Sequence, residues 1–534
     1  MSETADIVVA GAGHNSLITA AYLAKAGREC LVLDARPIPG GGAATEELLI
    51  PGYKLDSCST GHTLIQVNPL MLRDELRLRS EYGLEYLEPD PIAHVGFPDG
   101  EQLTHWLDLD LACEELARFS RRDADSYRRL IAEYDDVKEA FAKARSVPPG
   151  FGPSLDELLA EHPRGRIWMR RQAISAWDII RREFESRHVQ AYMLWQAFQT
   201  LVPVDAAGSG VNAYSIIFGR QRRSWTIPRG GSGALTDALV RCIEDNGGGV
   251  LCGRRVARLV LDGNRCLGVE TDEGEQYLAR EAVLSSIHVK HLVGMAPPDA
   301  WGEEFLYGVE TYDIGMPGMA AYFATSEPPL FETAYGTRSA VSAGAVGWPQ
   351  DVIRVGRDIK DGRFYEDVPW LLVATPTIVD PSRAPERMHT VKLLSPQTWE
   401  TPGGRSWGEL KEDVAQRQLD HLRRFAPNLT DDKIVARYVK SPADIEASNP
   451  HMIHGAFHGG DRSYPFSGKL RPVPGWAAHR MPIPGLYQTG ATTSVGGSIT
   501  GIPGRNAAMV MLSDFGTSIE EVVAGAGRAR AGSR

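Results

Sequence analysis

The decisive stretch lies near the N-terminus and reads Asp6-Ile-Val-Val-Ala10, then Gly11-Ala-Gly13-His-Asn-Ser16, then an apolar run to Gly27 and Cys30-Leu-Val-Leu-Asp34. This order predicts a strand, a glycine turn, a helix and a second strand that ends in an acid. A dinucleotide-binding βαβ unit requires the same order. We therefore expect an α/β fold built on a Rossmann-type domain.

Four positions in this stretch have distinct expected roles. Gly11 permits the sharp turn, and Gly13 lets the backbone approach a pyrophosphate at the helix N-terminus. Asp34 is placed to accept hydrogen bonds from both ribose hydroxyls of an adenosine. Ser16 stands where the pattern has its third glycine, and it is small enough for close packing of the helix on the strand.

Composition and charge exclude several other classes. The 534-residue chain has a formal net charge of −11, whereas binding nucleic acid requires a basic face. Its six cysteines are scattered and form no CxxC pair, which argues against a thioredoxin-type redox pair or a zinc cluster. The first strand begins almost at once, without a signal-peptide pattern, so we expect a cytoplasmic protein.

Glycine-rich segments recur at two later places. Pro39-Gly-Gly-Gly42 is either a flexible surface loop or a loop that passes close to a flat ring system. Gly485-Leu-Tyr-Gln-Thr489 reads as a buried strand, followed by a glycine loop to Gly501 and a helix from Ile502. FAD is long and needs protein at both ends. Backbone N–H groups of this late loop and the helix N-terminus are suited to the N1–C2=O edge of an isoalloxazine.

Glycine-rich, strand-patterned stretches alternate along the chain with charged, helical ones, and this alternation predicts a discontinuous arrangement of two domains. Residues 1–74, 224–297 and 474–522 are expected to form the FAD-binding domain. Residues 75–223 are expected to form the helical part of a substrate domain, and residues 298–473 its mixed sheet and helices. Residues 523–534 read as a flexible tail.

A basic, tryptophan-bearing segment from Arg164 to Arg182 has two interpretations. It is either a helix that contacts a membrane surface and admits a lipophilic substrate, or a solvated helix whose Trp and Ile side chains face the core. The sequence leaves both open, and it also leaves the oligomeric state open.

The chain resembles the FAD-dependent phytoene desaturase superfamily nearly from end to end. Within it, the resemblance is to the branch of O-type carotenoid ketolases and pyridine nucleotide-disulfide oxidoreductase domain-containing protein 2. It rests on Gly11-Ala-Gly-His-Asn15, Gly41-Gly-Ala-Ala-Thr45-Glu, Pro228-Arg-Gly-Gly231 with Gly233-Ala-Leu-Thr236, Ser441-Pro-Ala-Asp444, and Gly496-Gly-Ser-Ile499 with Gly501-Ile-Pro-Gly504-Arg-Asn-Ala507.

The resemblance implies a noncovalent FAD, an amine oxidase or phytoene desaturase-like fold with a mixed α+β substrate domain, and a set of cofactor-binding residues. No metal is implied. The candidate FAD-binding residues are Gly11, Gly13, His14, Asn15, Ser16, Asp34, Ala35, Arg36, Gly41, Gly42, Ala43, Ala44, Val256, Gly490, Ala491, Gly497, Ser498, Ile499, Gly501 and Ile502.

One departure from the family pattern lies where a substrate would meet the flavin. Relatives often carry Thr-His-Pro-Gly-Gly there, and this chain has Thr493-Ser-Val-Gly-Gly497. We therefore do not predict a carotenoid substrate for this protein from the resemblance.

Catalytic side chains have weak signals in this sequence. His62, after the first glycine loop, and His454, in a late loop, are candidates for a base or hydrogen-bond partner, while flavin N5 is the main reacting group. For each histidine, a structural or substrate-packing role is the competing interpretation.

Three functional hypotheses follow. The first is an FAD-dependent oxidoreductase that dehydrogenates an apolar small or isoprenoid-like substrate by hydride transfer to flavin N5, with oxygen or a quinone as acceptor. No second glycine turn in a βαβ setting is visible for NAD(P)H. The second is a flavin-dependent double-bond isomerase with no net redox change. The third is a non-catalytic binding protein of the GDP-dissociation-inhibitor type.

Overall fold

The predicted βαβ unit forms as strand β1 (Ser2–Ala10), helix α1 (His14–Lys25) and strand β2 (Cys30–Asp34) of the computed structural model, which describes residues 2–531. Strand β1 pairs in parallel with β2 on one side and with β12 on the other. Ile7 to Val9 and the whole of β2 are buried, because helices and loops cover both faces of the parallel part of this sheet.

The first sheet brings together three distant parts of the chain. Its order is β10-β11-β12-β1-β2-β9, and β20 pairs in parallel with the far end of β12. The turns Asp262-Gly-Asn and Asp272-Glu-Gly274 join β10, β11 and β12 as the antiparallel hairpins predicted from the sequence. The strands are β9 (Gly249–Cys252), β10 (Val256–Asp262), β11 (Arg265–Thr271), β12 (Gln276–Ser285) and β20 (Leu486–Gln488).

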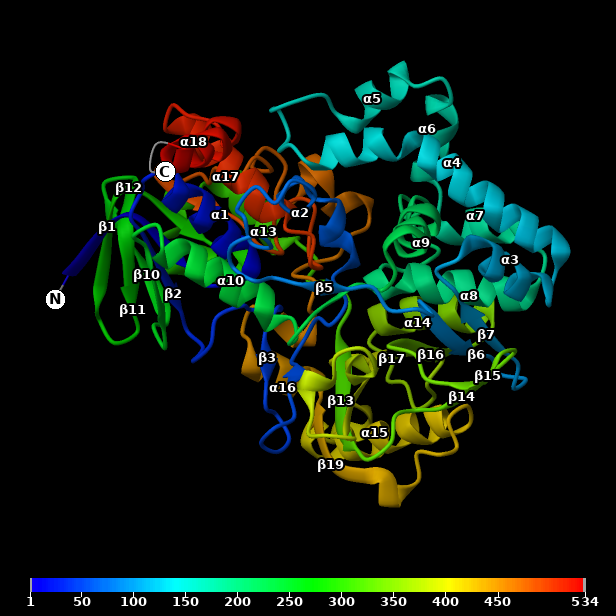
Figure 1. Ribbon diagram of the computed structural model, residues 1–534. Coiled ribbons are helices and arrows are strands. Elements are labelled where there is room, and N and C mark those ends of the chain that lie inside the picture. The colour runs from blue at the N-terminus through cyan, green and yellow to red at the C-terminus, as the bar shows by residue number, and fades with distance from the viewer. Residues whose placement is uncertain (1, 532–534) are drawn as a thin grey trace.

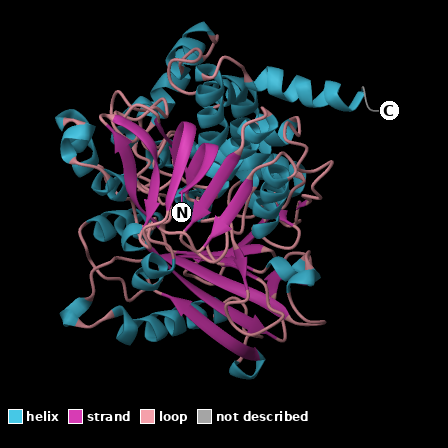
Figure 2. Cartoon of the chain, turned by 90° about the vertical axis from the view of Figure 1, so that its left-hand side faces the viewer, coloured by secondary structure: helices cyan, strands magenta, loops and turns pink. Residues whose placement is uncertain are grey.

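A second sheet lies below the first in Figures 1 and 2. Its order is β19-β13-β18-β17-β16-β6-β7, antiparallel except between β16 and β6. Helix α15 (Trp407–Arg423) packs on one face, where its buried side chains share a hydrophobic core with Met319, Ala321 and Phe323 of β13. The strands are β6 (Ala93–Gly96), β7 (Gln102–His105), β13 (Gly318–Thr325), β16 (Ser342–Val346), β17 (Trp370–Ala374), β18 (His389–Pro396) and β19 (Ile434–Lys440).

A layer of helices covers the other side of this substrate domain (Figure 1). Trp168, Ile179 and Ile180 of the basic segment are buried in its core, whereas Ile167 of the same segment is exposed. The helices are α3 (Leu109–Ala117), α4 (Arg121–Arg145), α5 (Leu155–Glu161), α6 (Gly165–Ala173), α7 (Ala176–Glu183), α8 (Arg187–Ala197), α9 (Asn212–Arg223) and α14 (Pro349–Lys360).

The remaining elements include α10 and α17, which pack on α1 in the first domain, and a set of mostly short strands and helices. The strands are β3 (Thr45–Glu46), β4 (Leu55–Asp56), β5 (Tyr86–Leu87), β8 (Ile227–Pro228), β14 (Phe331–Thr333) and β15 (Gly336–Arg338). The helices are α2 (Pro69–Leu72), α10 (Gly233–Glu244), α11 (Val289–Leu292), α12 (Pro298–Trp301), α13 (Glu303–Glu310), α16 (Pro442–Ser448), α17 (Ile502–Asp514) and α18 (Ile519–Ala531).

The C-terminal segment differs from the sequence prediction. The tail predicted from residue 523 is helical up to Ala531 as part of α18, and residues 532–534 lie outside the described residues. Val522 and Ile519 of this helix pack onto the core of the first domain, which explains how the helix begins.

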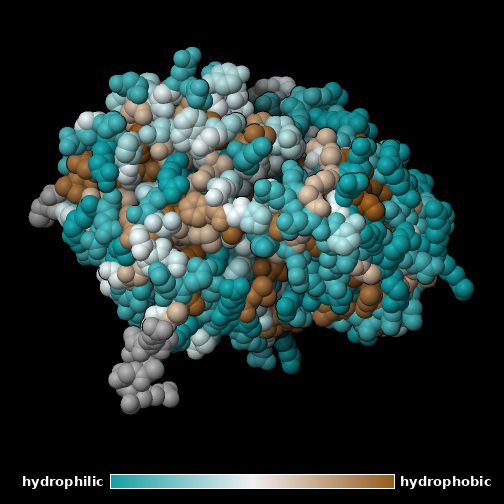
Figure 3. All heavy atoms as spheres, turned by 90° about the horizontal axis from the view of Figure 1, so that it is seen from above, coloured by the Kyte–Doolittle hydropathy of each residue, from teal (hydrophilic) through white to brown (hydrophobic). Residues whose placement is uncertain are grey.

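The face shown in Figure 3 is largely hydrophilic, and apolar side chains are interspersed among the hydrophilic ones. Within residues 2–531, no helix combines the length and apolar character needed to cross a lipid bilayer.

Helices α1 and α17 join the two ends of the chain. The Gly504 N–H donates to Asn15 Oδ1 at 3.2 Å, and Thr19 Oγ1 donates to Gly504 O at 2.8 Å. A Cβ atom on residue 504 would lie 2.3 Å from the backbone oxygen of Asn15. The glycine therefore sets how closely the two helices approach, and with them the two glycine loops.

We expect Gly504→Ala to push α17 away from α1. Overpacking of this kind costs about 1–3 kcal/mol of unfolding free energy, and the shift should also lower the flavin content of the purified protein. Urea unfolding and the ratio of flavin to protein absorbance measure both effects. Gly525→Ala is the matched control, since that exposed helical glycine has open space around its Cβ position. Normal stability and flavin content in Gly504→Ala would contradict the prediction.

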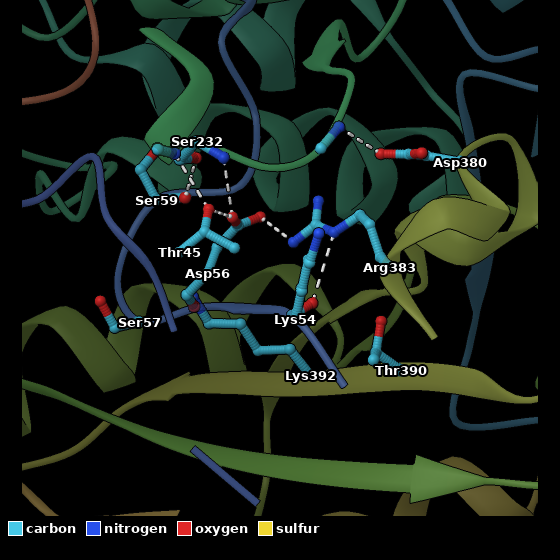
Figure 4. A network of polar contacts seen from close by, with 12 residues as sticks. Thr45, Lys54, Asp56, Ser57, Ser59, Ser232, Asp380, Arg383, Thr390 and Lys392 are labelled. Atoms are coloured by element: carbon cyan, nitrogen blue, oxygen red, sulfur yellow. Dashed lines mark hydrogen bonds and ion pairs between the residues drawn. The ribbon is translucent and has the colours of Figure 1, made fainter. Parts of the chain in front are cut away.

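A buried ion pair joins the two domains near the loop that contains Gly41 and Gly42. Arg383 Nη2 lies 2.7 Å from Asp56 Oδ2, and both side chains are 1% exposed. Asp56 Oδ1 also accepts hydrogen bonds from Ser232 N and Thr45 Oγ1, each at 2.8 Å (Figure 4). Asp56 therefore connects β4, the start of α10 and the substrate domain through its hydrogen bonds and its ion pair.

Candidate active site

A single cavity of about 670 Å³ runs from the glycine turn of the first sheet to the second sheet. At one end it is lined by Gly11 and Asp34, and at the other by Tyr322 of β13 and Trp370 of β17. Sixteen of the candidate FAD-binding residues line it: Gly11, Gly13, His14, Asn15, Ser16, Asp34, Ala35, Arg36, Gly41, Gly42, Val256, Gly490, Ala491, Gly497, Ser498 and Ile499.

Asp34 is held in a fixed orientation at the nucleotide end. Its Oδ2 accepts a hydrogen bond from Ala12 N at 2.7 Å, and its Oδ1 accepts one from Arg36 N at 2.8 Å. Burial raises the pKa of this carboxyl group, and the two N–H donors oppose that rise. Because each carboxylate oxygen has a second lone pair, Asp34 retains acceptor capacity on the cavity side.

The first turn of α1 offers unpaired donors to the cavity. Gly13 is its N-cap, no side chain caps the helix, and no acidic residue lies in its first turn. His14 Nε2 is buried without a hydrogen-bond partner. Gly41 packs against Gly13 so closely that a Cβ atom would lie 3.2 Å from Gly13 Cα. Such a helix N-terminus with close backbone suits an anionic pyrophosphate.

Ser16 has a structural reason to replace the glycine of the pattern. Its hydroxyl lies 2.5 Å from Gly11 O and 2.9 Å from Gly13 O, and Ser286 Oγ donates to it at 3.2 Å. The side chain therefore ties the glycine turn to the start of α1.

We expect Ser16→Ala to lower the free energy of unfolding by about 1 kcal/mol, the usual net value of one hydrogen bond. The flavin content should remain normal, because the glycine turn keeps its backbone contacts. Thermal unfolding of the purified protein and its flavin absorbance provide the measurements. The exposed helical Ser513→Ala is the control and should behave like the parent chain. Loss of flavin in Ser16→Ala alone would contradict this assignment.

The late glycine loop meets the same cavity from the other side. Gly490 and the run Gly497 to Ile499 line it, and α17 begins directly behind them at Gly501. The first turn of α17 contains no acidic residue, so its N–H groups remain suited to a partial negative charge. The two loops are held in register by the Asn15–Gly504 contact.

Four candidate cofactor residues lie behind the cavity wall. Ala43, Ala44 and Ile502 are buried and do not line the cavity, nor does Gly501, the left-handed N-cap of α17. Their carbonyls and packing support the wall: Ala43 O, for example, accepts a hydrogen bond from Thr236 Oγ1 at 2.8 Å.

The two candidate catalytic histidines are not brought to the cavity. His62 turns into the protein, where Nε2 lies 2.9 Å from Ser232 Oγ and Nδ1 lies 3.2 Å from Tyr86 OH. Burial lowers its pKa to about 3, so it is neutral at physiological pH. His454 stacks on Trp399 with ring centroids 4.4 Å apart. A structural role fits both side chains better than a role as base.

Sequence reasoning missed the side chains that the substrate domain contributes. Tyr322, Lys392 and Lys440 line the cavity from neighbouring strands of the second sheet. Lys392 Nζ donates to Cys58 O and to Asp56 O, and burial lowers its pKa. Its position between the apolar residues Val391 and Leu393 of β18 was the available signal.

Comparison of the sequence with known protein families supports the same assignment. A model of flavin-containing amine oxidoreductases matches residues 17–511. The chain belongs to this family. It is an FAD-dependent oxidoreductase, and the glycine turn and the late glycine loop that line the cavity fit FAD.

Several curated relatives span nearly the full length of the chain. A limonene dehydrogenase component of Castellaniella defragrans is 25% identical, with 97% of each chain covered. Pyridine nucleotide-disulfide oxidoreductase domain-containing protein 2 of Mus musculus is 26% identical, covering 96% of this chain and 94% of its own length. A lycopene-forming phytoene desaturase of Pseudescherichia vulneris is 25% identical, covering 95% and 99%. The predicted membership of the phytoene desaturase superfamily is confirmed.

Solved structures confirm the fold. Putrescine oxidase bound to putrescine superposes with a TM-score of 0.63 over 96% of this chain and 99% of its own, at 15% identity. The predicted combination of a Rossmann-type FAD domain with a substrate domain is therefore correct.

Proposed function

We propose that this flavoenzyme dehydrogenates an apolar small or isoprenoid-like substrate, with oxygen or a quinone as the final electron acceptor. Bound FAD supplies a hydride acceptor at N5. The chain's own contribution is to bind the substrate against it in a pocket shielded from water. The similarity of the chain to a limonene dehydrogenase component supports this substrate class.

The observation that carries the proposal is the lining of the substrate end. It is formed largely by Ile216, Trp225, Trp370, Leu372, Leu394 and Phe457. Among the described residues, Asp34 is the only carboxylate that lines the cavity, and it lies at the nucleotide end. An ammonium group beside the flavin would therefore find lysines rather than an acidic partner, which disfavours an amine substrate.

Anaerobic reduction of the flavin tests this proposal. The absorption spectrum is first recorded before and after acid precipitation, and colour released to the supernatant is expected for noncovalent FAD. Limonene, geraniol, cyclohexanol, putrescine and cyclohexylamine are then added separately without oxygen. We expect bleaching by an alkene or alcohol and none by the amines, followed by recovery of colour on adding oxygen or a quinone. Bleaching by an amine alone would refute the proposal.

A further inference from the structure

Arg220 is a buried cation at the substrate end of the cavity. It lies near the end of α9, is 6% exposed, and lines the cavity together with Gln199. In the part of the chain that the structure describes, no carboxylate lies within ion-pair distance of it. A buried charge without an opposite charge is costly, so its presence requires an explanation.

The groups that hold Arg220 are all neutral. Its Nη1 donates to Gln196 Oε1 and its Nη2 to Gln199 Oε1. Gln196 Nε2 then donates to Tyr192 OH at 2.6 Å, and Tyr192 OH lies 2.5 Å from His105 Nδ1. Burial lowers the pKa of Arg220 to about 10 and that of His105 to about 4. At neutral pH the arginine is therefore charged and the histidine is not.

Gln199 adds a buried N–H donor that has no acceptor. Arg220 carries donors only, so the amide oxygen of Gln199 must face it and the amide nitrogen must point away. That nitrogen, Nε2, is buried and has no hydrogen-bond partner. At the cavity, a cation without an opposite charge thus lies next to an amide N–H group without an acceptor.

We propose that Arg220 and Gln199 form a binding site for the carboxylate of the substrate. The substrate is then an apolar molecule that carries one carboxylate group, which lies against α9 while the apolar body fills the rest of the pocket. This inference rests on the proposed function for the apolar body. The charges around the pocket agree with it, because Lys392 and Lys440 also line the cavity and Asp34 lies at its far end.

Matched acids and alcohols test the site in the FAD-loaded protein. The probes are geranate against geraniol and decanoate against decanol, with binding followed by the shift of the flavin absorption spectrum and by equilibrium dialysis. We expect each acid to bind at least about tenfold more tightly than its alcohol, as for a hydrogen-bonded charged pair.

Three variants assign the preference to this site. Arg220→Met should abolish the preference for the acid. Gln199→Glu should abolish it too, since the new carboxylate pairs with Arg220 inside a protein that keeps its cation. Arg223→Met is the matched control on the same helix, where the side chain is exposed, and it should keep the full preference.

Equal binding of acid and alcohol by the parent protein would overturn the inference, as would a preference that survives in both Arg220→Met and Gln199→Glu. These outcomes are separate from those that test the dehydrogenase. Bleaching by geraniol without any preference for geranate removes the carboxylate site and leaves the proposed function. Tight binding of geranate that depends on Arg220, without bleaching by any probe, supports the site and removes the proposed function.

Discussion

The free energy of unfolding is expected to fall by several kcal/mol between pH 7 and pH 5. Four histidines outside the cavity are almost fully buried, and burial lowers the pKa of His62 to about 3 and of His94, His105 and His479 to about 4. The unfolded chain has ordinary histidines with a pKa of about 6.5. Between these values the unfolded state binds protons that the folded state does not.

The sign follows from that difference in proton binding. The full stabilisation from neutral buried histidines is present above pH 6.5. The free energy of unfolding then decreases as the pH falls, and this decrease ends only near the folded pKa values of about 3 to 4. Each buried histidine contributes roughly 2 kcal/mol of loss by pH 5. Carboxylates such as Asp56 add their effect only at lower pH, because Arg383 holds the pKa of Asp56 below its ordinary value against the opposing effect of burial.

Urea unfolding at half-unit steps from pH 7.5 to 4.5 measures this slope. His94→Gln tests a single contribution, since glutamine can still hydrogen-bond with Thr104 and Gln102 but does not titrate. The slope of this variant should be smaller by one proton. A free energy of unfolding that stays flat from pH 7 to pH 5 would contradict the prediction.

Much of the fold was predictable because its signals are local. The strand, turn and helix pattern around Gly11 and Gly13 depends on residues that are neighbours in sequence. The hairpin turns between β10, β11 and β12 have the same local origin. The late glycine loop was recognisable for the same reason, although its partner lies far away in the chain. Asn15 and Gly504 are 489 residues apart and share a hydrogen bond.

The directions of single side chains were not predictable. Gly61 packs so tightly on Trp225 that a Cβ atom would lie 2.7 Å from the indole ring, and the next residue, His62, does not line the cavity. Ser232, whose hydroxyl group forms a hydrogen bond with the His62 ring, lies 170 residues away in the sequence. Nothing in the local sequence distinguishes Arg220 from Arg222 and Arg223 on the same helix. Its burial depends on how α8 and α9 pack, and sequence spacing alone does not determine that packing.

The Asp56–Arg383 pair carries the second large prediction. Arg383→Met would leave Asp56 buried beneath the glycine loop without its cation, at a cost of about 3–5 kcal/mol in the free energy of unfolding. The contacts of Asp56 drawn in Figure 4 are the reason to expect an effect on cofactor binding as well. Asp56 bonds to Thr45 and to Ser232 N, and Thr45 follows the loop that contains Gly41 and Gly42. We therefore expect reduced flavin content as well as reduced stability.

Two further variants separate the charge effect from simple loss of packing. In Asp56→Asn/Arg383→Met, the amide oxygen can still accept from Ser232 N and Thr45 Oγ1, and no charge is left unpaired, so most of the lost stability should return. Arg387→Met is the matched control, because its ion pair with Glu386 is fully solvent-exposed. If the double variant is no more stable than Arg383→Met, the loss arises from packing of the arginine side chain and not from the unpaired carboxylate.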